Sequence, residues 1–228
     1  MHKKLADALS NARPKGFGCA FGNWTDTSRF VGFQPDLGWA MVPDALRSGY
    51  KHFDCALVYG SHRVVGTSLG IHAFAKGVKR SDIFVTTKVF HFPAPDLALD
   101  TQGKAIDMSK PGLDAKAQVA HDVEKSLDEL SMGYVDLCLL HWPGHPAATD
   151  PKQARLYRKQ AWSALEAMLK KGRCRSIGVS NFTKSHLEQL LEDCSVKPMV
   201  NQIEKSPYRA QVSKLARVSV RKIRNMSA

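Results

Sequence analysis

The sequence predicts an α/β fold of the (β/α)8 TIM-barrel type, but incomplete, with about six β/α units along its 228 residues. Short apolar runs of roughly four to eight residues suit strands that are buried on both faces, as in a parallel sheet. Between these runs lie longer segments whose apolar residues recur at helical spacing. Such alternation gives a parallel sheet with helices outside it, and the barrel is the commonest closed form.

Strands are expected in six places. The glycine-rich opening at 16–22 can supply the first one. The other five runs each end on a polar residue that can do chemistry, and the carboxyl ends of parallel strands are where α/β folds build their active sites. These five runs are 50–54, 82–88, 135–141, 176–181 and 198–202.

Helices are expected between the strands. Apolar stripes at 119–130, 162–169 and 187–191 have the spacing of helices that bury one face. Proline and glycine then predict helix ends. Pro43 fits the first position of a short helix that Gly49 closes, and Gly172 can cap a helix that ends at Lys171.

Two segments depart from this rhythm. The stretch 91–113 is long and rich in proline and glycine, and it follows the third strand, so it is either a lid over the catalytic rim or disordered. The last twenty residues contain six basic and no acidic side chains. We therefore expect a partial barrel over residues 1–208 and an atypical basic tail over 209–228.

Composition narrows the class of protein. The net charge is +12, but without the tail 27 basic face 21 acidic residues, a balance of +6. No zinc-finger, RNP-type or helix-turn-helix pattern accompanies the charge, so no nucleic-acid partner is expected. The chain has no apolar run near the roughly eighteen residues of a membrane helix and no signal core behind Met1, which predicts a cytoplasmic protein with no membrane partner. Five scattered cysteines predict reduced thiols.

Several motifs resemble those of one enzyme family. Residues 49–59, followed by Val65-Gly66, resemble the first signature of the aldo-keto reductases. Further matches follow in the family's order, over roughly residues 16 to 208. They are Thr87-Lys88, 134–143, 172–182 and 200–204. The resemblance implies a (β/α)8 barrel that reduces aldehydes and ketones, small-molecule carbonyl substrates, with a nicotinamide cofactor. That cofactor is usually NADPH, and NADH is possible.

The resemblance also implies roles for four catalytic residues. Tyr59 would donate the proton to the developing alkoxide, although a free phenol with a pKa near about 10 is a slow acid at neutral pH. Lys88 would lower the pKa of Tyr59, and Asp54 would hold Lys88 in place. His141 would hydrogen-bond the carbonyl oxygen of the substrate.

The cofactor and substrate residues follow from the same resemblance. Ser180, Asn181 and Gln202 would hold the nicotinamide carboxamide and so fix which face of the ring meets the substrate. An apolar substrate pocket would be lined by the aromatic residues Trp24, Phe90 and Trp142.

Each residue alone has a simpler interpretation. Asp54 and Lys88 can be a structural ion pair, and His141 a core histidine. Ser180 and Asn181 can cap a helix that starts near Phe182. The ordered set of motifs favours the family.

The sequence departs from the family in three places. His62 stands where the family commonly has Glu, and Cys19-Ala20 replaces a Thr-aromatic pair. The resemblance stops after Tyr208. Members of the family continue with a seventh strand, whose aromatic residue stacks on nicotinamide, and with an eighth unit, whose Lys-Ser and Arg cluster holds the adenosine phosphate. The chain is therefore expected to be a C-terminally truncated member. The strands near Gly18 and Met199 would then have unpaired edges, and the tail can form one helix over the gap.

Two other functions stay open. One is a catalytically inactive, reductase-like protein that binds a cofactor or partner without turnover. The other is a metal-dependent hydrolase on the same fold, because His52 and Asp54 alternate on one strand and Lys88 and His141 follow. Such a site needs at least three convergent ligands, which the sequence does not supply, so no metal ligand is assigned. The oligomeric state and the carbonyl substrate are not defined by the sequence.

Overall fold

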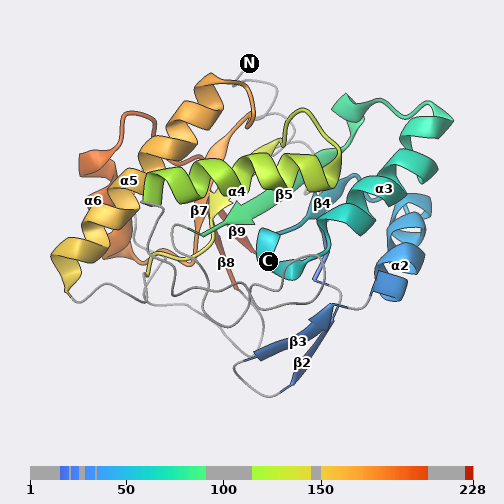
Figure 1. Cartoon of the computed structure of the whole chain (residues 1–228), viewed down its shortest axis with the longest axis horizontal. Coiled ribbons are helices and arrows are strands. Elements are labelled where there is room, and N and C mark those ends of the chain that lie inside the picture. Colours follow the sequence, from blue (N-terminus) through green and yellow to red (C-terminus); the bar gives the residue numbers. More distant parts are fainter. Residues whose placement is uncertain are drawn as a thin grey trace.

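The computed structural model describes residues 16–20, 22–25, 29–33, 35–90, 115–144, 150–204 and 224–227. Its centre is a curled sheet in which seven strands run parallel (Figure 1). The strands are neighbours in the order β1 (Gly16–Gly18), β4 (His52–Asp54), β5 (Phe84–Val89), β6 (Leu137–Leu140), β7 (Ile177–Ser180), β8 (Val200–Ile203) and β9 (Arg224–Ser227). The prediction of an incomplete barrel-type α/β fold is therefore confirmed.

In the part of the chain that the structure describes, five helices lie between these strands along the sequence and cover the sheet from outside (Figure 1). They are α2 (Pro35–Arg47), α3 (His62–His72), α4 (Ala115–Leu130), α5 (Pro151–Lys170) and α6 (Lys184–Asp193). The described residues also form short 3-10 turns, namely η2 (Leu57–Tyr59), η3 (Phe74–Lys76) and η4 (Arg80–Asp82). A separate hairpin, which the sequence did not predict, pairs β2 (Gly22–Thr25) with β3 (Arg29–Phe33).

Burial on both faces explains the apolar strands. All four residues of β6 and of β7 are buried, because the interior lies on one side and the helices on the other. The predicted apolar stripes are the inner faces of α4, α5 and α6, where Val123, Trp162 and Leu187 are at most 1% exposed. The five strand runs and the three stripes are confirmed.

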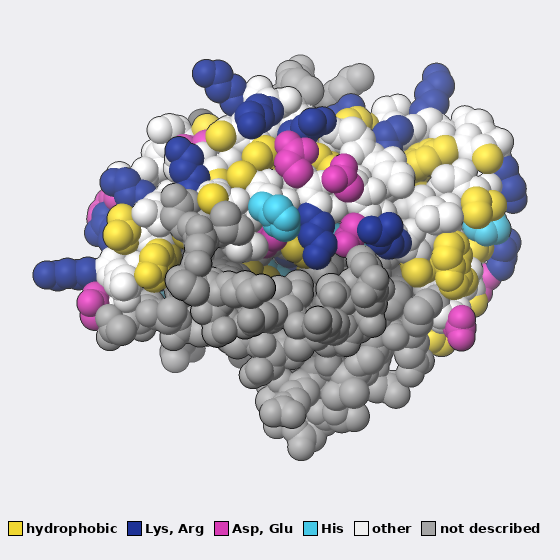
Figure 2. Space-filling view, viewed as in Figure 1, with side chains coloured by type: hydrophobic (Ala, Val, Ile, Leu, Met, Phe, Trp, Pro, Cys, Tyr) yellow, Lys and Arg dark blue, Asp and Glu magenta, His cyan; other side chains and the backbone are white. Residues whose placement is uncertain are grey.

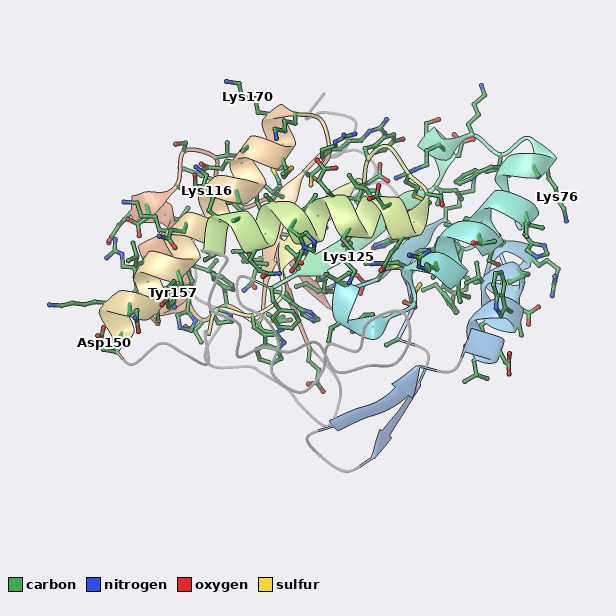
Figure 3. The ribbon with its side chains drawn as sticks, in the orientation of Figure 1. Lys76, Lys116, Lys125, Asp150, Tyr157 and Lys170 are labelled. Atoms are coloured by element: carbon green, nitrogen blue, oxygen red, sulfur yellow. The ribbon has the colours of Figure 1, made fainter. Side chains whose placement is uncertain are left out.

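Caps fix the ends of α5 and α6. The Asp150 carboxylate accepts the backbone N–H groups of Lys152 and Gln153, and Gly172 (φ 74°) follows the helix end in the left-handed region, as predicted. Asp150 and Lys170 mark the two ends of α5 in Figure 3. Helix α6 is capped by Thr183, in a reciprocal capping box with His186.

The prediction for Pro43 is wrong. Helix α2 begins at Pro35, so Pro43 lies inside it instead of at its first position. A proline there costs one backbone hydrogen bond. Val42 and Ala45, which flank it on the inner face, are 0% and 4% exposed, and their burial in the core offsets this loss. Gly49 (φ 82°) does follow the helix end.

The predicted free edge at Met199 is also wrong. Strand β9 lies in the expected tail and pairs in parallel with β8, from Val200 opposite Arg224 to Ile203 opposite Ser227. At the other end of the sheet, β1 has β4 as its one neighbour among the described strands. The expected tail helix at 212–218 and the expected lid at 91–113 lie outside the described residues.

Several of the exposed large apolar residues in the described part belong to α2 and α3. Leu37, Trp39, Met41 and Ile71 are 40% to 53% exposed, and Figure 2 shows yellow side chains gathered on this side of the molecule. Among the described helices, none combines the length and apolar character that crossing a bilayer requires. All five cysteines are unpaired, and four of them are buried.

Candidate active site

Three of the predicted catalytic side chains meet at the carboxyl end of the sheet. Asp54 is the last residue of β4, Lys88 lies near the end of β5, and Tyr59 ends the η2 turn that follows β4. The Lys88 Nζ atom donates to Asp54 Oδ1 at 2.9 Å, to the Cys55 carbonyl oxygen at 3.1 Å and to the Tyr59 hydroxyl at 3.4 Å. One ammonium group therefore joins the carboxylate to the phenol.

Lys88 is a buried cation. Its side chain is 2% exposed, and burial by itself would lower the pKa of its ammonium. Asp54 and Tyr59 together outweigh burial, so the pKa of Lys88 is raised above its ordinary value. Lys88 stays protonated at neutral pH and keeps a fixed positive charge beside Tyr59.

The pKa of Tyr59 reflects two opposing effects. Burial raises the pKa of the phenol, whereas Lys88 lowers it through its charge and its hydrogen bond, and the balance is a raised pKa. The sign of the Lys88 effect on the pKa of Tyr59 is as predicted from the sequence, but burial has the larger effect. The ammonium also lies 5.0 Å from the centre of the Tyr59 ring, which adds a cation–π contact.

His141 is neutral in this setting. Burial lowers the pKa of its imidazole well below the ordinary value, and the Lys88 charge lowers it further. Its Nδ1 atom is buried and has no hydrogen-bond partner in the part of the chain that the structure describes. The Tyr59 ring packs edge-on against it, with centroids 5.9 Å apart. A neutral imidazole can donate one N–H hydrogen bond to a substrate, but it does not supply a proton as an imidazolium would.

The three predicted cofactor residues lie beside this cluster. The Ser180 hydroxyl donates to the backbone oxygen of Gln202 at 2.9 Å. The amide of Asn181, a residue with φ 61°, donates to the His141 carbonyl oxygen at 2.9 Å and to the Ser180 hydroxyl at 3.1 Å. Gln202 donates its side-chain amide to Asp54 Oδ2 at 3.2 Å. Ser180 and Asn181 do not cap α6, because Thr183 does so.

Two of the three predicted pocket residues lie against His141. The Phe90 ring centroid is 4.9 Å and the Trp142 centroid 6.5 Å from that of His141. Phe90 is buried, while Trp142 is 49% exposed and so offers apolar surface to a ligand. Trp24 lies in β2, and its side chain is outside the described part of the structure.

His62 lies between Thr87 and Glu129, which the sequence did not reveal. It is fully buried at the start of α3, with Nε2 2.9 Å from the Thr87 hydroxyl and Nδ1 3.5 Å from Glu129 Oε2. Burial lowers the pKa of His62, so the ring is neutral. His62 thus lies between Glu129 on α4 and Thr87, the residue before Lys88. The one feature of the sequence that pointed to His62 was that it replaces the Glu common in the family.

A metal site finds no support in the geometry. His52 Nε2 lies 2.9 Å from the Thr86 hydroxyl, and the described residues contain no group of three His, Cys, Asp or Glu side chains able to hold a metal ion.

Cys19, at the second departure from the family motif, lies fully buried, and its backbone N–H donates to the Asp54 carbonyl oxygen at 3.0 Å.

Comparison with known proteins finds a family model and several relatives that match this chain. The model of the aldo/keto reductase family matches residues 19–226, which extends past the end of the resemblance at Tyr208. The chain is 36% identical over 170 residues to a glyoxal reductase of Bacillus subtilis, covering 75% of the chain and 49% of that protein. It is 38% identical over 181 residues to a D-galacturonate reductase of Hypocrea jecorina, covering 74% and 51%. The chain thus spans about half the length of the curated relatives it matches.

Solved structures give the same result. An aldo-keto reductase of Bombyx mori in complex with NADP aligns with a TM-score of 0.69 and 27% identity, over 93% of this chain and 61% of that one. A second aldo-keto reductase, complexed with NADPH, aligns with a TM-score of 0.62 and 32% identity, over 83% of this chain and 50% of that one.

Proposed function

Because the chain belongs to the aldo/keto reductase family, we propose that it reduces a small aldehyde or ketone to an alcohol with NADPH, and that Tyr59 donates the proton. One observation carries this assignment. The buried Lys88 ammonium lies within hydrogen-bond distance of both Asp54 Oδ1 and the Tyr59 hydroxyl. Such a cation favours a phenolate over a phenol, which is what a proton-donating tyrosine needs.

The polar groups beside Lys88 fit the carboxamide of a nicotinamide ring. That group has two N–H donors and one oxygen acceptor. Gln202 uses its amide nitrogen on Asp54, which leaves its amide oxygen to accept an N–H group, and the Ser180 and Asn181 side chains lie next to it. When bound, the reduced nicotinamide supplies a hydride to the carbonyl carbon. NADPH is proposed over NADH because the solved relatives hold NADP or NADPH.

The chain's own residues then handle the proton. As negative charge grows on the substrate oxygen, the Tyr59 hydroxyl transfers its proton to that oxygen, and the Lys88 ammonium stabilises the resulting phenolate. The neutral His141 ring donates an N–H hydrogen bond to the same oxygen. Low exposure strengthens both interactions, because charges attract more strongly where water is excluded.

The relatives' names suggest the class of substrate. A glyoxal reductase and a D/L-glyceraldehyde reductase are among them, so we propose a small, oxygen-rich aldehyde. Phe90 and Trp142 supply apolar surface next to His141 and help keep water from the reacting oxygen. All these residues lie within 1–208, the part that we propose forms the catalytic unit. Five unpaired thiols fit a reducing compartment such as the cytoplasm.

The test is Tyr59→Phe, which keeps the ring and removes the proton. Turnover of glyoxal or glyceraldehyde with NADPH should fall by about a hundredfold or more. NADPH affinity, followed by tryptophan fluorescence, should stay nearly constant. Tyr50→Phe, which removes a phenolic hydroxyl from a residue outside the proposed site, is the matched control.

Two results would contradict the proposal. Near-normal turnover in Tyr59→Phe would show that another group is the acid. Micromolar NADPH binding without turnover in the unchanged chain would favour the catalytically inactive, reductase-like alternative.

A further inference from the structure

Gln202 makes a contact that cofactor binding does not explain. It lies in β8, whereas Asp54 ends β4, and three strands separate β4 from β8 in the sheet. The hydrogen bond from Gln202 Nε2 to Asp54 Oδ2, at 3.2 Å, therefore spans the interior of the curled sheet. Gln202 is 4% exposed, so water competes little for this bond.

We propose that Gln202 is a positioning residue that fixes the Asp54 carboxylate and, through it, the Lys88 ammonium against the Tyr59 hydroxyl. The inference rests on the proposed function and deepens it. Asp54 offers two oxygens, and among the described residues Lys88 donates to Oδ1 and Gln202 to Oδ2. A carboxylate held at one oxygen alone can rotate about its last side-chain bond, whereas one held at both cannot.

Lys88 has no spare hydrogen to compensate for such a rotation. An ammonium has three donors, and Lys88 directs them to Asp54, Cys55 and Tyr59. The Cys55 carbonyl belongs to the backbone and cannot follow a moving lysine. If the Asp54 carboxylate turns, Lys88 keeps its ion pair only by lengthening the 3.4 Å contact to Tyr59.

The backbone at Gln202 is itself held firmly. Its carbonyl oxygen accepts the Ser180 hydroxyl at 2.9 Å and the Asn181 backbone N–H at 2.9 Å. The starting point of the side chain is thus fixed by β7 and the residue after it. The Gln202 amide can then hold Asp54 through its nitrogen while its oxygen stays available to a bound carboxamide. Asp54, Lys88 and Tyr59 would thereby be held in place next to the cofactor.

The experiment titrates Tyr59 directly, without cofactor or substrate. The chain is labelled at the tyrosine ring carbon that bears the hydroxyl, its NMR signal is followed with pH, and Tyr59→Phe assigns it. Gln202→Met keeps the side-chain length and removes the donor, and Gln202→Glu keeps the shape and replaces the donor with a carboxylate. Asn201→Ala is the control, since Asn201 bonds the backbone of Phe182 and does not touch Asp54.

Burial raises the pKa of Tyr59, the Lys88 charge lowers it, and the Asp54 carboxylate raises it. At a fixed pH below the midpoint, the phenolate fraction of Tyr59 should therefore be at least about threefold lower in Gln202→Met than in the unchanged chain. It should be lower still in Gln202→Glu, because a second negative charge is added. Asn201→Ala should lower the melting temperature but leave the titration in place.

An unchanged titration in folded Gln202→Met would overturn the proposal and leave Gln202 with cofactor binding alone. If Gln202→Met does not fold, Gln202→Leu, which also removes the donor and adds no charge, decides by the same criterion. The measurement needs no turnover, so an inactive chain would count against the proposed function without touching this inference. If the chain is active, alcohol oxidation at saturating cofactor gives a second readout. The pH at which Tyr59 becomes the phenolate base should be higher in Gln202→Met than in the unchanged chain.

Discussion

Gly66 and Gly70 lie four residues apart on α3, and an alanine should have opposite effects at the two positions. A Cβ added at Gly66 would lie 2.3 Å from the Leu130 carbonyl oxygen, at the end of α4, and 2.6 Å from its carbonyl carbon. Ordinary van der Waals contact begins at 3.4 Å, so the two helices would have to separate by about 1 Å. A Cβ at Gly70 meets nothing within 4 Å.

These distances give the size of each effect. Overpacking of this kind costs about 1–3 kcal/mol, so Gly66→Ala should lower the melting temperature by roughly 2–12 °C for a chain of this length. Gly70→Ala removes a flexible glycine from a helix interior and should stabilise the chain by about 0.5–1 kcal/mol. Denaturant unfolding followed by circular dichroism measures both changes.

The close approach also bears on the site. Helix α3 begins three residues after Tyr59, so displacing it should lengthen the 3.4 Å contact between Lys88 and Tyr59 and slow turnover. Gly70→Ala should leave turnover unchanged. Equal stability of the two variants would refute the reasoning, because it would mean that α3 and α4 are not held at the distance that Gly66 permits.

Two further predictions concern charge. Lys88→Met removes the group that lowers the pKa of Tyr59. The phenolate base needed for alcohol oxidation should therefore appear at higher pH, and turnover at pH 7 should be at least about tenfold slower. A pH–rate profile measures this, and an unshifted profile would mean that Lys88 has a structural role only. Burial raises the pKa of Asp122 to about 6 from 3.8, so the folded chain binds more protons than the unfolded one between these values and loses stability as pH rises through them. Asp122→Asn should therefore be more stable than the unchanged chain at pH 7.5, by up to about 3 kcal/mol, and the advantage should shrink towards pH 4. An advantage that stays constant with pH would exclude ionisation as its cause.

The strands and the main helices could be predicted because burial leaves a direct record in the sequence. A run such as 135–141 is apolar on both faces, and its counterpart β6 is buried on both faces. The position of Pro43 could not be predicted from local proline preferences, because tertiary burial of Val42 and Ala45 keeps the helix continuous through it. Strand β9 was missed because the pattern around Arg224 is polar, and its pairing depends on β8.

The contacts among Asp54, Lys88 and Tyr59 could be predicted from the sequence, but the balance of effects on the pKa of Tyr59 could not. The structure brings Asp54, Lys88 and Tyr59 together as the motifs predicted, because Asp54 and Lys88 lie at or near the ends of neighbouring strands and Tyr59 lies in the turn after β4. The raised pKa of Tyr59 could not be predicted, because the depth of burial is a property of the folded chain. The Asp54–Gln202 contact was equally hidden, because no local pattern relates two residues whose strands face each other across the interior.

The sequence separation of that contact has a consequence for how the site is assembled. Asp54 and Gln202 are 148 positions apart, and contacts of such long range form late because the intervening chain must first be closed into a loop. A nascent chain that has emerged as far as β7 already carries Asp54, Tyr59 and Lys88, yet the second oxygen of Asp54 has no donor. Both oxygens of Asp54 are held by donors only when β8, which carries Gln202, joins the sheet. The site is therefore among the last parts of this chain to mature, and hydrogen exchange during refolding should show β8 gaining protection after β5 and β6.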